Sequence, residues 1–179
     1  MRVYNLLGDM SYDVDRINAV RDALAERSAK VKNDAPFAKH LQDLSEKTDE
    51  LRKKIVATKE GGAITGEERI REKTTGLYGD FVFYEGRPGD YQLARIGSLK
   101  KELGDVETEF DNLVAKELPA VNKSLTKKKL ALIEELTRKA WDAANSDSSG
   151  GAGGAMTTGA MTAGAMTTAR KWSSLRLPH

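Results

Sequence analysis

The sequence predicts an all-α protein, an up-down bundle of three long amphipathic helices followed by a shorter C-terminal segment. Apolar residues recur at alternating steps of three and four over three long stretches, as they do along the buried face of an α-helix. Residues that end helices or begin new ones separate these stretches. The 179 residues are 39% hydrophobic and 31% charged, a composition that suits one domain with a buried core.

The first helix is expected over residues 3–31. Its apolar or small residues form one stripe: Val3, Leu7, Met10, Val14, Ile17, Leu24, Ser28 and Val31. Arg21 interrupts this stripe, and Val20 beside it covers the gap. A glycine at position 8 lies off the stripe and weakens the helix locally by about 1 kcal/mol.

The second helix follows a short turn. Asn33 and Asp34 can both cap it, and Pro36 suits its first turn because the missing N–H costs nothing there. Its stripe consists of Phe37, Leu41, Leu44, Thr48, Leu51 and Ile55. The Glu-Gly-Gly segment at 60–62 is expected to end it. Two helices joined by so short a turn pack antiparallel.

Residues 60–90 form a crossover that is rich in glycine and aromatic residues. A connection of about thirty residues is too long for a simple turn, so it carries structure or function of its own. A short helix over 65–71, capped by Thr65, is expected within it. Four aromatic residues of the crossover are expected to plug one end of the bundle: Tyr78, Phe81, Phe83 and Tyr84.

The third long helix is expected to begin with Asp90 as its cap. Its stripe consists of Ile96, Leu99, Leu103, Val106, Phe110 and Leu113. Pro119 should kink or end this helix, because an interior proline costs roughly 3 kcal/mol, although a continuation through 120–125 is compatible with the pattern. The apolar residues of 130–136, together with Trp141, predict a shorter fourth helix.

The chain is expected to divide at residue 144. Residues 1–144 form the helical bundle domain. Residues 145–179 are dominated by Gly, Ala, Ser, Thr and Met, which bury too little apolar surface to offset backbone entropy. This low-complexity tail is therefore expected to be disordered.

Composition and motifs exclude several function classes. The formal net charge of +2 gives no overall field toward nucleic acid, and no run of 18 apolar residues predicts a membrane span. The N-terminus lacks the apolar run of a signal peptide, so a cytoplasmic protein is expected as expressed. With no cysteine and with His40 and His179 as the histidines, thiol chemistry and a Ser-His-Asp triad are disfavoured.

Two acidic sets offer oxygen ligands to a hard cation such as Ca²⁺. They are Asp9, Asp13 and Asp15 in the first helix, and Asp105, Glu107, Glu109 and Asp111 in the third. Alternate residues of a helix point to different faces, so solvated surface is the favoured interpretation of both sets. Asp105 and Glu109 are kept as the candidate metal ligands. The lysines at 127–129 are more typical of a helix end than of a phosphate site.

A candidate binding surface lies around the end of the crossover. Aromatic faces beside mixed charges are typical of partner and sugar recognition, and this segment has seven such residues: Tyr78, Tyr84, Glu85, Arg87, Asp90, Tyr91 and Arg95. The structural alternative is favoured at this stage. In it, Arg87 and Asp90 brace the loop onto the helix while the tyrosines close the bundle.

The same region carries a family resemblance. The motifs at 64–69 (ITGEER), 77–79 (LYG), 84–93 (YEGRPGDYQL) and 117–122 (ELPAVN) resemble the helical C-terminal region of bacterial sortilin-type, Asp-box β-propeller proteins described as glycosyl hydrolase-like. The likeness spans residues 2–144. It implies a packing or interaction module that follows a propeller, within a family that is exported. The propeller, which would carry any glycosidase chemistry, is not part of this sequence.

A fainter resemblance is to hydrolases of N-acylhomoserine lactones known from environmental DNA. It implies a quorum-quenching lactone or ester hydrolase in which Ca²⁺ or another ion activates water. Two functions therefore remain open, an interaction module and a metal-dependent hydrolase. The partners expected are a protein or the missing propeller, an acyl-homoserine lactone, or a second copy in a homodimer, since stripes left exposed by the missing propeller could drive dimerisation.

Overall fold

The computed structural model describes residues 2–31, 33–58, 66–83 and 88–146. Their regular secondary structure consists of α1 (Arg2–Lys30), α2 (Ala35–Ile55), α3 (Ile70–Val82), α4 (Asp90–Lys127) and α5 (Arg138–Ser146). The all-α prediction is confirmed. The low-complexity tail was expected to be disordered from residue 145, but Asn145 and Ser146 are the last residues of α5, and the rest of the tail, from 147 onward, lies outside the described residues.

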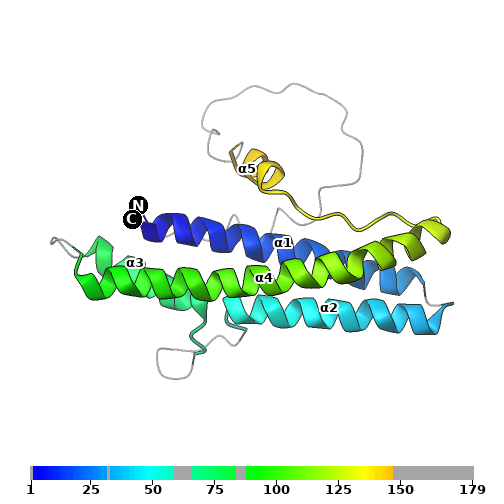
Figure 1. Ribbon diagram of the computed structural model, residues 1–179, viewed down its shortest axis with the longest axis horizontal. Helices are drawn as coiled ribbons and strands as arrows, with labels where there is room; N and C mark the ends of the chain where they lie inside the picture. Colours follow the sequence, from blue (N-terminus) through cyan, green and yellow to red (C-terminus); the bar gives the residue numbers. More distant parts are fainter. Residues whose placement is uncertain (1, 32, 59–65, 84–87, 147–179) are drawn as a thin grey trace. The chain divides into compact units, whose positions relative to one another are not determined.

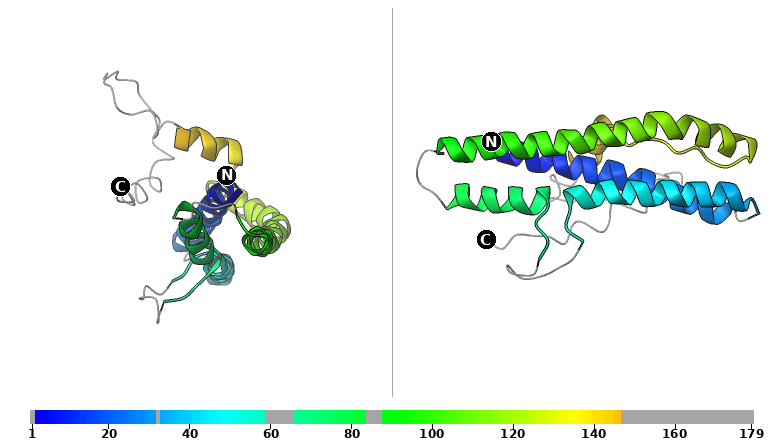
Figure 2. Two further views of the ribbon diagram at one scale, coloured as in Figure 1. Left: turned by 90° about the vertical axis from the view of Figure 1, so that its left-hand side faces the viewer. Right: turned by 60° about the horizontal axis from the view of Figure 1, so that its bottom comes forward.

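The helices α1 to α4 form an up-down bundle of three rows that alternate in direction, in which α2 and α3 share one row. α1 and α2 are an antiparallel hairpin, α3 continues beyond the end of α2, and α4 runs back along both (Figures 1 and 2). The chain up to Arg138 is one compact unit, and the residues from Lys139 belong to a second. The expected domain boundary at residue 144 stays a prediction.

The α1–α2 hairpin begins and ends much as the sequence predicts. Asp34 is the N-cap of α2 and accepts a 3.3 Å hydrogen bond from the backbone N–H of Phe37. In α1 the buried stripe passes through Leu6 rather than Leu7. α2 ends at Ile55, ahead of the expected stop at 60–62, because Val56 turns to an extended conformation that buries its side chain beside Ile55.

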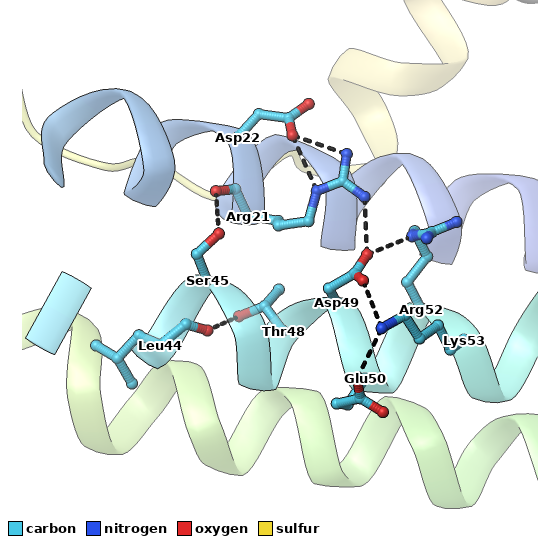
Figure 3. A network of polar contacts seen from close by, with 9 residues as sticks. All are labelled: Arg21, Asp22, Leu44, Ser45, Thr48, Asp49, Glu50, Arg52 and Lys53. Carbon is cyan, nitrogen blue, oxygen red and sulfur yellow. Dashed lines mark hydrogen bonds and ion pairs between the residues drawn. The ribbon is translucent and has the colours of Figure 1, made fainter. Parts of the chain in front are cut away.

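Arg21, which interrupts the stripe of α1, has a structural role in the hairpin. Its guanidinium reaches Asp49 of α2 at 3.1 Å, and Asp49 also pairs with Arg52 at 2.8 Å and with Lys53 at 3.0 Å (Figure 3). Partial burial would raise the pKa of Asp49, but the hydrogen bonds from these three cations outweigh it and lower the pKa to about 2. The network fastens α1 to α2 at the edge of the core.

α3 begins later than the sequence predicts. The expected short helix over 65–71 is wrong in its first residues, because Gly66 to Arg69 are not helical and the helix starts at Ile70; the expected cap, Thr65, lies outside the described residues. Glu72 reaches back to accept hydrogen bonds from the backbone N–H groups of Arg69, at 3.2 Å, and Ala57, at 3.1 Å. The start of α3 therefore depends on a contact with the segment that leaves α2.

α4 is one continuous helix of 38 residues. Gly89 is its N-cap, one residue before the expected cap. Pro119 lies inside the helix without ending it: both Pro119 and Ala115, whose carbonyl loses its helical partner, are exposed, so water can satisfy that carbonyl. After Phe110 the stripe continues with Val114 rather than Leu113, because an average spacing of 3.6 requires steps of four more often than three.

The shorter C-terminal helix expected from the apolar residues of 130–136 and from Trp141 is found in part: Trp141 lies in α5, whereas residues 130–137 are not helical. After α4 the chain turns at Lys129, which has a φ of 56°, and the backbone N–H of Leu130 bonds to the carbonyl of Leu125 at 3.0 Å, as in a Schellman motif. Residues 130–137 then run without helical structure, and we refer to them as the strap. Ile133 of the strap is buried in the core, and the main chain of the strap bonds to Arg27 of α1 and Asn122 of α4 on either side of the seam between these helices.

Candidate functional site

An open groove of about 600 Å³ lies between α3 and α4. Its lining is mixed in charge and contains Glu68, Glu72, Lys73, Gly76, Leu77, Asp80, Gly89, Tyr91, Gln92 and Arg95. The caps of both helices shape it, since Glu72 caps α3 and the side chain of Gln92 accepts a 3.0 Å hydrogen bond from the N–H of Gly89. The groove is therefore held at one end of the bundle by two defined helix starts.

Five large apolar side chains of the described residues are exposed at the end of the bundle that holds this groove. The side chains of Phe83 and Tyr91 are 90% and 79% exposed. We call the whole set the apolar end surface, and it consists of Tyr4, Val82, Phe83, Tyr91 and Leu93. These residues belong to the start of α1, the end of α3 and the start of α4, which lie at the same end of the bundle (Figures 1 and 2). The set includes three aromatic rings that contribute little to the core: those of Tyr4, Phe83 and Tyr91.

The structure brings together part of the candidate surface that the sequence indicates. Tyr91 and Arg95 line the groove, and Asp90 is the exposed first residue of α4. Tyr78 does not join them, because its ring is half-buried against the core. Three further candidates, Tyr84, Glu85 and Arg87, lie outside the described residues.

The expectation that the crossover aromatics plug the bundle holds for part of the set. Tyr78 and Phe81 pack against the core, whereas Phe83, the residue after α3, points its ring into solvent. Tyr84 is not among the described residues. Sequence reasoning missed the exposure of Phe83 and Val82 because an apolar residue at the end of a helix gives no signal of its own about which way it faces.

The candidate metal ligands Asp105 and Glu109 lie one turn apart on the exposed side of α4. Glu109 is paired with Lys54 of α2, with 2.5 Å between its Oε2 and the lysine Nζ. Among the residues that the structure describes, no group of three or more His, Cys, Asp or Glu side chains is placed to hold a metal ion. A calcium site at Asp105 and Glu109 stays a prediction.

One pair of carboxyl groups does not fit the solvated-surface interpretation. Asp13 of α1 is 4% exposed, and no donor in the described part of the chain reaches its Oδ2. Burial, together with the hydrogen bond and the charge of Glu107 from α4, raises the pKa of Asp13 to about 8. Arg16 lowers this pKa and Asp9 raises it, by smaller amounts. At neutral pH the Asp13 carboxyl is therefore mostly protonated, and as a neutral acid it can donate a hydrogen bond to Glu107.

No family model, no curated protein and no solved structure matches this chain. Of the helices in the described ranges, none combines the length and the apolar character that a membrane crossing requires. The function is therefore inferred from the chain's own surfaces, of which the apolar end surface and the groove beside it are the most distinctive.

Proposed function

We propose that this protein is a packing and interaction module that docks its α3 end onto a protein partner. The observation that carries the proposal is the apolar end surface, in which Phe83 is 90% exposed and Tyr91, which lines the groove, is 79% exposed. Exposed apolar patches rimmed by polar residues mark protein–protein contact sites, and aromatic residues dominate the binding energy of such sites.

The charged residues of the groove suit a protein contact. Lys73 pairs with Glu102 at 3.7 Å, which places a charged rim along the groove, and Arg95 lines the groove between the helices. A polar rim around an apolar centre is the usual anatomy of a protein interface. The resemblance to helical regions that follow Asp-box propellers supports a propeller domain as the partner.

The test is the affinity for a purified Asp-box β-propeller domain from a bacterial sortilin-type protein, measured by calorimetry. Loss of both rings in Phe83→Ser/Tyr91→Ser should weaken binding by at least about tenfold. The matched control is Leu132→Ser, because Leu132 is a large, exposed apolar residue of the strap and lies outside the apolar end surface. Equal affinities of the two variants, or no binding by the unaltered chain, would contradict the proposal.

Calcium-dependent hydrolysis of N-acylhomoserine lactones stays the alternative prediction. Its candidate ligands are Asp105 and Glu109, and Lys54 already neutralises the second of them. Hydrolysis by the purified chain, measured with EDTA and again with calcium restored, tests it directly. Turnover that EDTA abolishes and calcium restores would establish an enzyme, and Asp105→Ala/Glu109→Ala should then remove that turnover.

A further inference from the structure

The main chain of the strap is held by polar side chains of α1 and α4. The side-chain amide of Asn122 makes two hydrogen bonds to Ile133, donating to its carbonyl and accepting from its N–H, both at 2.9 Å. Arg27 donates to the carbonyl of Ala131 at 2.9 Å. The hydroxyl of Tyr12 donates to the carbonyl of Leu136 at 3.0 Å. These bonds are made to backbone atoms, so they are available to any extended segment of suitable shape.

Two side chains of the strap also contact the rest of the bundle, one through burial and one through an ion pair. Ile133 is 3% exposed and belongs to the core. Glu135 pairs with Arg16, whose guanidinium also pairs with Asp111 at 2.7 Å and stacks over the ring of Phe110 at 4.9 Å. The guanidinium is therefore positioned by α4 independently of the strap. In an extended chain residues two apart face the same side, which accounts for the joint recognition of Ile133 and Glu135.

The strap's sequence does not favour the conformation that it adopts. Residues 130–137 read Leu-Ala-Leu-Ile-Glu-Glu-Leu-Thr, and all but two of these are strong helix formers. Hydrogen bonds from α1 and α4, together with the apolar pocket of Ile133, hold the strap in its non-helical conformation. Contacts across the seam between α1 and α4 therefore override the local helical preference. The strap therefore stays bound largely because it is part of the same chain. The tether gives it an effective concentration at this site in the millimolar range.

We propose that the seam between α1 and α4 is a peptide-binding groove, which the strap occupies in cis. It would accept an extended segment of another protein in which a branched aliphatic residue is followed two positions later by a carboxylate. The aliphatic residue would take the pocket of Ile133, the carboxylate would pair with Arg16, and Asn122 would bind the main chain. This surface is separate from the apolar end surface, and neither proposal depends on the other.

The test uses the full chain and a fluorescent peptide with the sequence of residues 129–138. The variant Ile133→Asp/Glu135→Lys displaces the strap from the groove. It should bind the peptide at least about tenfold more tightly than the unaltered chain, because the tethered competitor is gone. Failure of this variant to bind the peptide, with its helix content intact by circular dichroism, would overturn the proposal.

Two variants of the groove control for nonspecific binding. In the displaced-strap background, Asn122→Ala should lose most of the peptide binding, whereas Lys123→Ala, the exposed neighbour on α4, should keep it. Equal binding by these two variants would overturn the main-chain recognition.

A second measurement uses the unaltered chain, so its result does not depend on whether a variant folds. In the unaltered chain the N–H of Ile133 is hydrogen-bonded to Asn122, so its hydrogen exchange should accelerate when excess unlabelled peptide displaces the strap. An exchange rate that millimolar peptide leaves unchanged would contradict the proposal, whatever the displaced-strap variant does.

Discussion

The two ends of the bundle are built differently. At the turn end, where α1 meets α2 and α4 finishes, Lys128 pairs with Asp34 at 2.6 Å and lies over the ring of Phe37 at 5.6 Å. Asp34 also caps α2, and Leu125 is fully buried. At the α3 end, the start of α1, the end of α3 and the start of α4 instead leave the apolar end surface in solvent.

The difference shows that exposed rings are not a necessary result of ending a bundle. The same chain closes its turn end with a cap, an ion pair and a buried leucine, so it has the means to cover apolar residues. The exposure of Phe83 and Tyr91 at the α3 end is the observation on which the proposed docking surface rests.

The largest expected effect is the pH dependence of stability that Asp13 contributes, at a site between the two ends of the bundle. A raised pKa in the folded state means that the folded chain holds a proton that the unfolded chain releases. The stability contributed by Asp13 is thus complete below its unfolded pKa of about 4 and is lost as pH rises toward about 8. Its contribution to the free energy of unfolding should fall by up to about 1.4 kcal/mol per pH unit across this window.

Urea unfolding at pH 5 and pH 7.5 measures this slope. Asp13→Asn has the shape of the protonated acid and can still donate to Glu107, so this variant should remain folded and should unfold with a much flatter pH dependence. Equal slopes for the variant and the unaltered chain would contradict the raised pKa of Asp13.

The next effect contrasts the two ends directly. Leu125→Ala at the turn end should cost about 2–5 kcal/mol of unfolding free energy, because it leaves a cavity at a fully buried site. Phe83→Ala at the α3 end removes a larger side chain, yet it should change stability by no more than about 0.5 kcal/mol. Urea unfolding of both variants checks the contrast, and a large loss in Phe83→Ala would show that its ring belongs to the fold.

The sequence predicts features whose cause is local. The start of α2 follows from Asp34 and Pro36, which act on the turn in which they stand. The start of α3 was missed because Glu72 bonds to Ala57, a residue of another segment. The non-helical strap was missed because its sequence favours a helix, and hydrogen bonds from Asn122 of α4 and from residues of α1 override that preference.

The candidate site divides in the same way. The aromatic and charged pattern indicated Tyr91 and Arg95, which line the groove. The acidic pattern included Asp13, but only in a set interpreted as solvated surface, because neither its burial nor its contact with Glu107 of α4 can be read from the sequence. Pairing between distant segments is the information that one sequence does not contain.

The smallest expected effect sharpens the account of the turn end. Lys129 has a φ of 56°, which a side chain disfavours, so Lys129→Gly should raise the free energy of unfolding by up to about 1 kcal/mol. The control Lys127→Gly, inside the last turn of α4, should lower it by about 0.5–1 kcal/mol. Opposite signs in urea unfolding support the helix stop at Lys129, and losses of the same size would contradict it.

Hydrogen exchange with the propeller domain bound tests the central claim most directly. If the α3 end is the docking surface, adding the purified Asp-box propeller should slow backbone exchange in residues 77–83 and 90–95. Exchange at the turn end, in residues 33–38 and 124–130, should stay the same. Protection confined to the turn end, or spread evenly over the bundle, would contradict the assignment of the α3 end as the docking surface.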